Sequence, residues 1–133
     1  MNMNRRIVVI GGTNHREIDE NINNLKQYSK NTVKVSAVFG KSLECVKDVI
    51  LRDFNKRRNF LVIETTIKEK DNGFLLIKEL KESGFGGNII SHSMHSRKEQ
   101  AKFITADHFA RKNFFHEIIS CVKGECDCNK LKE

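Results

Sequence analysis

Short apolar segments alternate with longer segments of helical periodicity along the chain. Residues 7–10 and 60–63 are apolar runs, a pattern typical of strands covered on both faces of a sheet. Residues 33–37 alternate between apolar and polar side chains, which predicts an edge strand with one solvated face. Ile89 begins a fourth predicted strand, and Phe109 lies in a short fifth one.

Apolar residues between the strands recur every three or four positions, which predicts amphipathic helices. Asn14, Ser42 and Ser96 are expected N-caps, the last in a capping box with Glu99, and Gly84 fits a helix C-terminus. The positions assigned to the helices are Ile18, Ile22, Leu25 and Tyr28; Leu43, Val46, Ile50 and Phe54; residues 74–80; residues 96–103; and Phe115, Ile118, Ile119 and Val122.

Five strand–helix units in 133 residues predict a single α/β domain built from parallel βαβ units. The expected fold is a flavodoxin-like, doubly wound (βα)5 three-layer sandwich with strand order 2-1-3-4-5. We expect the domain to span residues 1–123, followed by a C-terminal tail of residues 124–133. In such sheets ligands meet the loops at the carboxyl ends of the strands, so function is expected there.

The composition is that of an ordinary soluble domain, with 38% hydrophobic and 31% charged residues. No apolar run approaches the length that spans a bilayer, and the run after Arg5 and Arg6 is too short for a signal peptide, so a cytoplasmic protein is expected. The net charge of +7 is scattered over the sequence. The densest basic cluster, residues 56–58, is interpreted as a solvated loop, and a nucleic-acid partner is not expected.

The four cysteines do not predict a disulfide framework. Cys45 lies at an apolar position of a predicted helix, which indicates a buried thiol. Cys121, Cys126 and Cys128 form a C-x4-C-x-C cluster. A metal site there would need a fourth ligand and tight turns that the short tail does not supply, so we expect reduced thiols and no metal.

Three histidines lie near the predicted ends of strands four and five: His92, His95 and His108. Only His95 clearly belongs to a loop, and their spacing is not diagnostic of a metal site. They are therefore interpreted as surface residues or as histidines with satisfied hydrogen bonds. No cofactor is expected.

Several segments together resemble the receiver domains of response regulators. Residues 61–64, the turn at 71–73 and residues 74–80 are similar to the third strand, loop and third helix of that family. Residues 89–93 resemble its fourth strand, which ends in a switch serine or threonine. Residues 106–114 resemble the fifth-strand signature, the most specific of these matches. The resemblance covers roughly residues 5–123.

The resemblance implies an acidic pocket that this chain has largely lost. In receivers, two acidic residues after strand one and an aspartate ending strand three bind magnesium, and the aspartate accepts a phosphoryl group. Here Gly11 and Gly12 stand in place of the acidic pair. Glu64, or Thr65 in a shifted alignment, stands in place of the acceptor. We therefore expect no phosphorylation and no enzymatic activity.

The same resemblance implies that other residues of the receiver's activation switch are present. Ser93 matches the switch hydroxyl, Lys112 the conserved lysine and Phe109 the switch aromatic residue. Asn113 replaces the usual proline, so the cis peptide after the lysine is not expected. A Glu64–Lys112 ion pair that holds the domain permanently in one state is a hypothesis that follows.

The function expected is that of a stand-alone pseudo-receiver in a two-component or phosphorelay type of signalling, which acts by contact with a protein partner. The partner is a kinase, a transcription regulator or a second copy of the chain. The predicted partner surface contains Phe109, Phe114 and Phe115, on the face formed by helix four, strand five and helix five, through which receivers form dimers.

Two alternatives remain open from the sequence. In the first, the chain is a working phosphoacceptor in which Asp71 or Glu64 replaces the lost acids. In the second, it is a small anion or nucleotide binder that uses Gly11, Gly12 and Thr13 at the start of the first helix. Phosphoryl uptake distinguishes the first alternative, and a nucleotide-dependent rise in melting temperature distinguishes the second.

Overall fold

One parallel sheet forms the centre of the molecule. The computed structural model describes residues 4–11, 15–67 and 71–132. All strand pairs are parallel, and the strand order is β2-β1-β3-β4-β5, as the sequence predicts. The strands are β1 (Arg6–Gly11), β2 (Lys34–Phe39), β3 (Asn59–Glu64), β4 (Asn88–Ser93) and β5 (His108–Arg111).

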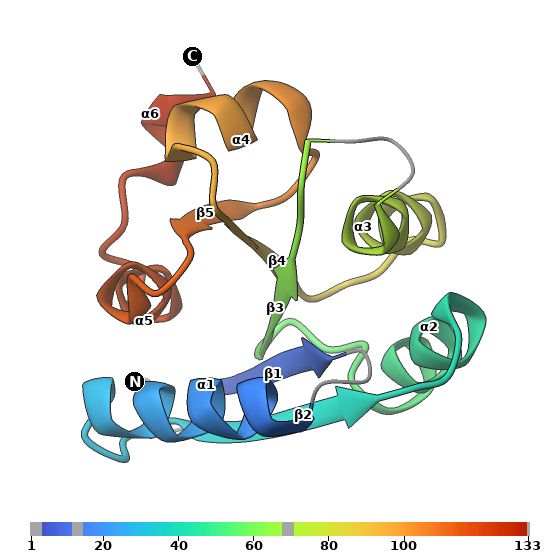
Figure 1. Ribbon diagram of the computed structural model, residues 1–133, viewed down its shortest axis with the longest axis horizontal. Coiled ribbons are helices and arrows are strands. Elements are labelled where there is room, and N and C mark those ends of the chain that lie inside the picture. Colours follow the sequence, from blue (N-terminus) through green and yellow to red (C-terminus); the bar gives the residue numbers. More distant parts are fainter. Residues whose placement is uncertain (1–3, 12–14, 68–70, 133) are drawn as a thin grey trace.

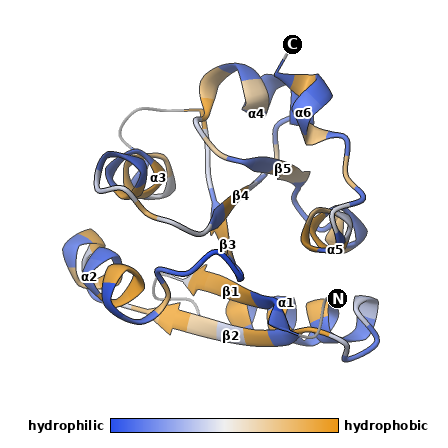
Figure 2. Ribbon diagram, turned by 180° about the vertical axis from the view of Figure 1, so that it is seen from behind, coloured by the Kyte–Doolittle hydropathy of each residue, from blue (hydrophilic) through white to orange (hydrophobic). Residues whose placement is uncertain are grey.

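Helices cover both faces of this sheet. Figures 1 and 2 show α1 and α5 on one face and α2 and α3 on the other, while α4 and α6 lie together beside β5. The three layers of the expected sandwich are therefore present. The helices are α1 (His15–Tyr28), α2 (Leu43–Asp53), α3 (Asn72–Glu82), α4 (Arg97–Phe103), α5 (Phe115–Lys123) and α6 (Cys128–Leu131).

The predicted helix boundaries follow from local hydrogen bonds. The Ser42 hydroxyl accepts from the Cys45 amide at 3.2 Å, and the Ser96 hydroxyl accepts from the Glu99 amide at 3.2 Å. Gly84 adopts φ +75 just beyond the end of α3, a conformation that favours glycine. These predictions are confirmed, whereas the predicted cap at Asn14 lies outside the described residues.

Burial follows the position of each strand in the sheet. In the central strand β3, residues 59–63 are all buried, and Glu64 at its carboxyl end is exposed. In the edge strand β2 only Val38 is buried. Helices α2 and α5 present the predicted apolar faces, with Val46 and Ile50 buried in α2. The polar groups at the strand ends are thus carried by a rigid apolar core.

Two features differ from the sequence analysis. Cys45 is exposed, so the prediction of a buried thiol is wrong. Its neighbour Val46 points into the core, and Cys45 lies about 100° away around the helix. The second feature is α6, which was not predicted and packs against α4 and β5. Among the described residues, no helix is both long and apolar enough to cross a membrane.

Candidate functional site

Lys112 lies at the centre of the charged groups at the carboxyl edge of the sheet. Its Nζ atom is 3.0 Å from Oε1 of Glu64 and 3.4 Å from Oε1 of Glu17. The predicted Glu64–Lys112 ion pair is therefore confirmed. The hydrogen bond to Glu64 raises the pKa of Lys112, so the ammonium group is charged at neutral pH.

The backbone around Lys112 is fixed by hydrogen bonds to β4 and α5. The Lys112 amide donates to the carbonyl of Ser93 at 2.7 Å. The preceding amide, of Arg111, donates to the buried carboxylate of Glu117 at 2.8 Å. Asn113 follows with φ +70, in the left-handed region. Proline fixes φ near −65° and cannot adopt this conformation, so a proline at this position would require a different turn.

Glu64, rather than Thr65, faces Lys112. The Thr65 side chain is buried, and its hydroxyl lies 2.7 Å from that of Ser91 inside the sheet. The Thr65 amide donates to the carbonyl of His92 at 2.9 Å and extends the pairing of β3 with β4. Of the two candidates for the acceptor position, Glu64 is therefore the one whose carboxylate is available at the edge of the sheet.

Ile18 fills the space next to Gly11. A Cβ atom added at Gly11 would lie 1.5 Å from Cδ1 and 2.8 Å from Cγ1 of Ile18. No side chain fits there without movement of the Ile18 side chain, which is buried. Position 11 thus contributes no carboxylate, and an apolar residue of α1 takes up the space. Gly12 and Thr13, which the sequence analysis also singled out, lie outside the described residues.

His92, not Ser93, shares the face of Glu64. Glu64 pairs with His92 in the register of β3 and β4, so their side chains point to the same side of the sheet. Ser93 is fully buried on the other side, where its hydroxyl accepts from the His95 amide at 3.3 Å. The Ser93 hydroxyl is therefore not directed at Glu64, because neighbouring side chains of a strand point to opposite faces of the sheet.

His92 is a buried, neutral imidazole. Its Nε2 atom accepts from the Asn113 amide at 3.3 Å, and its ring lies 6.3 Å from the ring of Phe115. Burial lowers the pKa of His92, although Glu64 opposes this effect. The histidine therefore supplies a hydrogen-bond acceptor to the turn after β5 rather than a positive charge.

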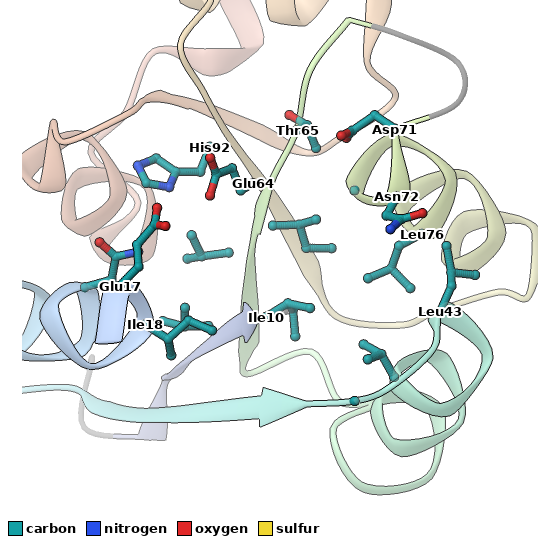
Figure 3. A pocket seen from close by; sticks show the side chains of 18 of the residues that line it. Ile10, Glu17, Ile18, Leu43, Glu64, Thr65, Asp71, Asn72, Leu76 and His92 are labelled. Atoms are coloured by element: carbon teal, nitrogen blue, oxygen red, sulfur yellow. The ribbon is translucent and has the colours of Figure 1, made fainter. Parts of the chain in front are cut away.

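An open pocket of about 490 Å³ adjoins this cluster, between the carboxyl ends of β1 and β3. Figure 3 shows Glu17, Glu64 and His92 on one side of the pocket and Asp71 and Asn72 on the other. Asp71 is already engaged, because its Oδ2 atom accepts from the amides of Phe74 at 3.1 Å and Thr66 at 3.2 Å. Its carboxylate is therefore the N-cap of α3.

Only one of the predicted partner-surface residues is accessible. Phe109 is fully buried and Phe115 is 6% exposed, so neither can contact a partner directly. Phe114 is 37% exposed, and the guanidinium of Arg111 lies 3.9 Å from its ring centroid. The inward position of Phe109 follows from the packing of β5 between α4 and α5.

The α6 segment covers part of the face formed by α4 and β5. Arg97 of α4 pairs with Asp127 at 2.5 Å, and its Nε atom donates to the carbonyl of Phe109 at 3.1 Å. Lys132 places its ammonium group 5.8 Å from the centroid of the Phe109 ring. A partner on this face therefore meets α6 as well as α4 and β5.

The structure also brings together His108 and the three C-terminal cysteines, whose ligand atoms all lie within 4.8 Å of one another. The described part of the tail supplies no fourth ligand atom of its own, and the fourth one comes from His108 in β5, which the sequence analysis did not connect with the cysteines. The signal was present in the predicted topology, because a helix that follows a parallel strand returns its C-terminus to the level where that strand begins. His108 begins β5, and Cys121 lies near the end of α5.

Comparisons with known proteins identify the fold. No protein-family model matches the sequence, and no match was found among curated proteins. Among solved structures, the chain resembles the receiver domain of a putative Luxo repressor protein from Vibrio parahaemolyticus, with a TM-score of 0.62 and 11% identity over 96% of this chain and 92% of that one. It also resembles the response regulator TrrA from Thermotoga maritima, solved with Mg²⁺-BeF, with a TM-score of 0.57 and 17% identity over 92% of this chain and 99% of that one.

A cobalamin-binding protein from Desulfitobacterium hafniense is similar to the same degree, with a TM-score of 0.64 and 10% identity over 92% of this chain and 59% of that one. The chain thus has the fold of response-regulator receivers, and one cobalamin-binding protein contains the same arrangement. Because proteins of different function share this fold, the function has to be argued from the side chains at the strand ends.

Proposed function

We propose that this chain is a signalling protein of the receiver type that acts through a protein partner and without phosphorylation. The receiver fold, which extends over nearly the whole chain, supports the signalling role. The side chains at the carboxyl edge of the sheet support the independence from phosphorylation. The coordination of Lys112 by Glu64 and Glu17 is the observation that carries the proposal.

Phosphoryl transfer to a receiver depends on a magnesium ion that offsets the charge of the incoming phosphate. Magnesium needs several oxygen ligands in octahedral geometry. In this pocket Ile18 takes the space next to Gly11, and the carboxylate of Asp71 caps α3. Among the described residues that line the pocket, the two remaining carboxylates, Glu17 and Glu64, already share the ammonium group of Lys112. The lysine thus supplies the positive charge that magnesium supplies in phosphorylatable receivers.

The same ion pair favours one state of the domain. In a phosphorylated receiver the conserved lysine pairs with the phosphoryl group, and here it pairs with the carboxylate of Glu64 at 3.0 Å. Phe109, the residue at the switch position, is fully buried. We infer that Glu64 acts as a built-in phosphomimetic. The partner, which is a kinase, a transcription regulator or a second copy of the chain, recognises the state that the ion pair favours.

Intact mass after incubation with magnesium and a small phosphodonor tests the independence from phosphorylation. We expect no gain of a phosphoryl group, under conditions in which a phosphorylatable receiver used as a positive control does gain one. A gain that Glu64→Ala abolishes would identify Glu64 as a working acceptor and overturn the proposal. A gain that survives in Glu64→Ala would also overturn it and would place the acceptor elsewhere.

Affinity for the partner tests the phosphomimetic role. Once a partner has been captured from lysate, or self-association has been measured by light scattering, Glu64→Ala and Lys112→Ala should both weaken the interaction. Glu82→Ala is a matched control, because Glu82 is exposed at the end of α3. Equal affinity of wild type and Glu64→Ala would contradict the role of the ion pair.

A further inference from the structure

Four side chains outside the receiver pocket form a compact cluster of nitrogen and sulfur ligands. His108 begins β5, Cys121 lies in the last turns of α5, Cys126 is in the following loop, and Cys128 begins α6. Each offers one ligand atom, and no two of these atoms are more than 4.8 Å apart. The cysteines are unpaired thiols, and Cys121 and Cys128 are almost fully buried.

Two of the six separations between the ligand atoms are close to the edges of a tetrahedral metal site. The Sγ atoms of Cys121 and Cys128 are 3.6 Å apart, and Sγ of Cys126 lies 3.4 Å from Nδ1 of His108. Tetrahedral zinc has Zn–S bonds of about 2.3 Å and Zn–N bonds of about 2.0–2.1 Å, which correspond to S–S edges of about 3.8 Å and S–N edges of about 3.5 Å. The remaining separations are all within 4.8 Å and would shorten as the four atoms close around one ion.

The chain between the cysteines is shaped to bring them back to β5. Gly124 ends α5 with φ +76, and its amide donates to the carbonyl of Cys121 at 3.1 Å. This left-handed residue reverses the chain, so that Cys126 and Cys128 return to the strand that carries His108. The four-residue helix α6 that follows has no side-chain N-cap bond. A helix this short is marginal by itself and gains from an additional attachment.

The surroundings of Cys128 suit a metal-bound thiolate. Its sulfur accepts from the Phe109 amide at 3.4 Å and from the Arg97 guanidinium at 3.5 Å. Three thiolates around a divalent ion leave one negative charge, which the guanidinium of Arg97 can offset. Such outer contacts orient and tune metal ligands.

We propose that His108, Cys121, Cys126 and Cys128 bind one zinc ion that fastens α6 to β5. Sulfur and imidazole ligands without a carboxylate favour zinc over magnesium, calcium or manganese. Four protein ligands leave no position for water or substrate, so the site is structural rather than catalytic. This inference is independent of the proposed signalling function, because none of the four ligands belongs to the pocket around Lys112.

Metal content and cobalt spectroscopy test the site. The full chain is prepared without a metal-binding tag, kept in a reductant that contains no thiol, and analysed by plasma mass spectrometry. We expect one zinc per chain. After replacement of zinc by Co²⁺, we expect the visible absorption of tetrahedral cobalt together with a sulfur-to-cobalt charge-transfer band. A chain that takes up no zinc, or that gives an octahedral cobalt spectrum, would overturn the proposal.

Matched variants distinguish metal binding by the cluster from unspecific metal binding elsewhere on the protein. Cys126→Ser and His108→Ala should lower Co²⁺ affinity by more than the about 10- to 100-fold that loss of an outer contact costs, and Arg97→Ala should fall within that range. Cys45→Ser and His116→Ala should bind as wild type does, because both side chains are exposed and lie outside the cluster. Equal affinity in all variants would contradict the assignment.

Thiol labelling of the wild type gives a readout that does not depend on variants folding. With zinc present, Cys45 should be alkylated while Cys121, Cys126 and Cys128 are protected, and a chelator should remove the protection of Cys126 in particular, which is only half-buried. A Cys121–Cys128 disulfide formed in air by protein that takes up no Co²⁺ when reduced would show a redox pair instead and would refute the metal site.

Discussion

Lys112 and Glu64 form an ion pair across the carboxyl edge of the sheet, with Nζ and Oε1 3.0 Å apart. Glu64 ends β3 and Lys112 follows β5, so the pair spans the end of β4, which lies between these strands. The two side chains are 50% and 28% exposed. Exposed ion pairs contribute little to stability, so this pair is expected to add little to the free energy of folding. Its main effect is expected on the orientation of the two side chains.

A double-mutant cycle with Glu64→Gln and Lys112→Met measures the coupling free energy between the two side chains. The coupling free energy should be below about 1 kcal/mol and should decrease as salt is added. Because the folded-state pKa of Lys112 is raised above 10.5, the contribution is fully present below pH 10.5 and is lost as the pH rises through the folded value. Urea unfolding from neutral to alkaline pH, at low and high salt, provides the data. A coupling insensitive to both salt and pH would contradict an ionic interaction.

A side chain at position 11 should destabilise the protein. In Gly11→Ala the new methyl group would overlap Cδ1 of Ile18. Overpacking of this kind typically costs about 1–3 kcal/mol, and Gly11→Asp should cost more because it also buries a charge. Thermal and urea unfolding of the variants measure the loss in the free energy of unfolding directly.

The double variant Gly11→Ala/Ile18→Val provides the control for this steric explanation. Removing Cδ1 of Ile18 alone should cost about 0.5–1.5 kcal/mol. In that background the additional cost of Gly11→Ala should be smaller than in the wild type, which appears as a favourable coupling energy. Additive losses would show that Gly11 is required for a reason other than the contact with Ile18.

His92 should make the protein sensitive to mild acid. Burial lowers its folded-state pKa below 6.5, so the unfolded chain binds the proton more readily. Stability is therefore full above pH 6.5 and is lost as the pH falls toward the folded value. We expect a shallower pH dependence in His92→Gln than in wild type when the free energy of unfolding is measured from pH 7.5 to pH 5. The exposed His116→Gln should follow the wild type.

The strands, helix caps and strand order could be predicted because they depend on local patterns. Ser42 and Ser96 cap helices through residues three positions away, and the buried run of β3 identifies a central strand. The face of a side chain at a strand end was harder to predict. Ser93 and His92 are neighbours, and a shift of one residue exchanges the two sides of the sheet. The resemblance indicated Ser93, whereas the register places His92 on the same face as Glu64.

Contacts between distant segments account for the remaining differences. The fourth member of the cysteine cluster, His108, is separated from Cys121 by the rest of β5, the turn that follows it and most of α5. The burial of Phe109 depends on packing of β5 between helices that sequence periodicity does not position relative to one another. The Glu64–Lys112 pair is also distant in sequence, yet it was predictable, because the carboxyl ends of parallel strands meet at one edge.

Asp71 is expected to serve as a helix cap and not as a phosphoacceptor. Its carboxylate accepts from the amides of Phe74 and Thr66, so Asp71→Ala should cost about 0.5–2 kcal/mol, similar to Ser42→Ala at the cap of α2. Asp71→Ser retains a capping oxygen and should retain most of this stability. Urea unfolding of the three variants gives the comparison. If Asp71 were the acceptor, the wild type would gain a phosphoryl group that the stable Asp71→Ser variant lacks, and intact mass of both proteins after phosphodonor treatment decides between the two roles.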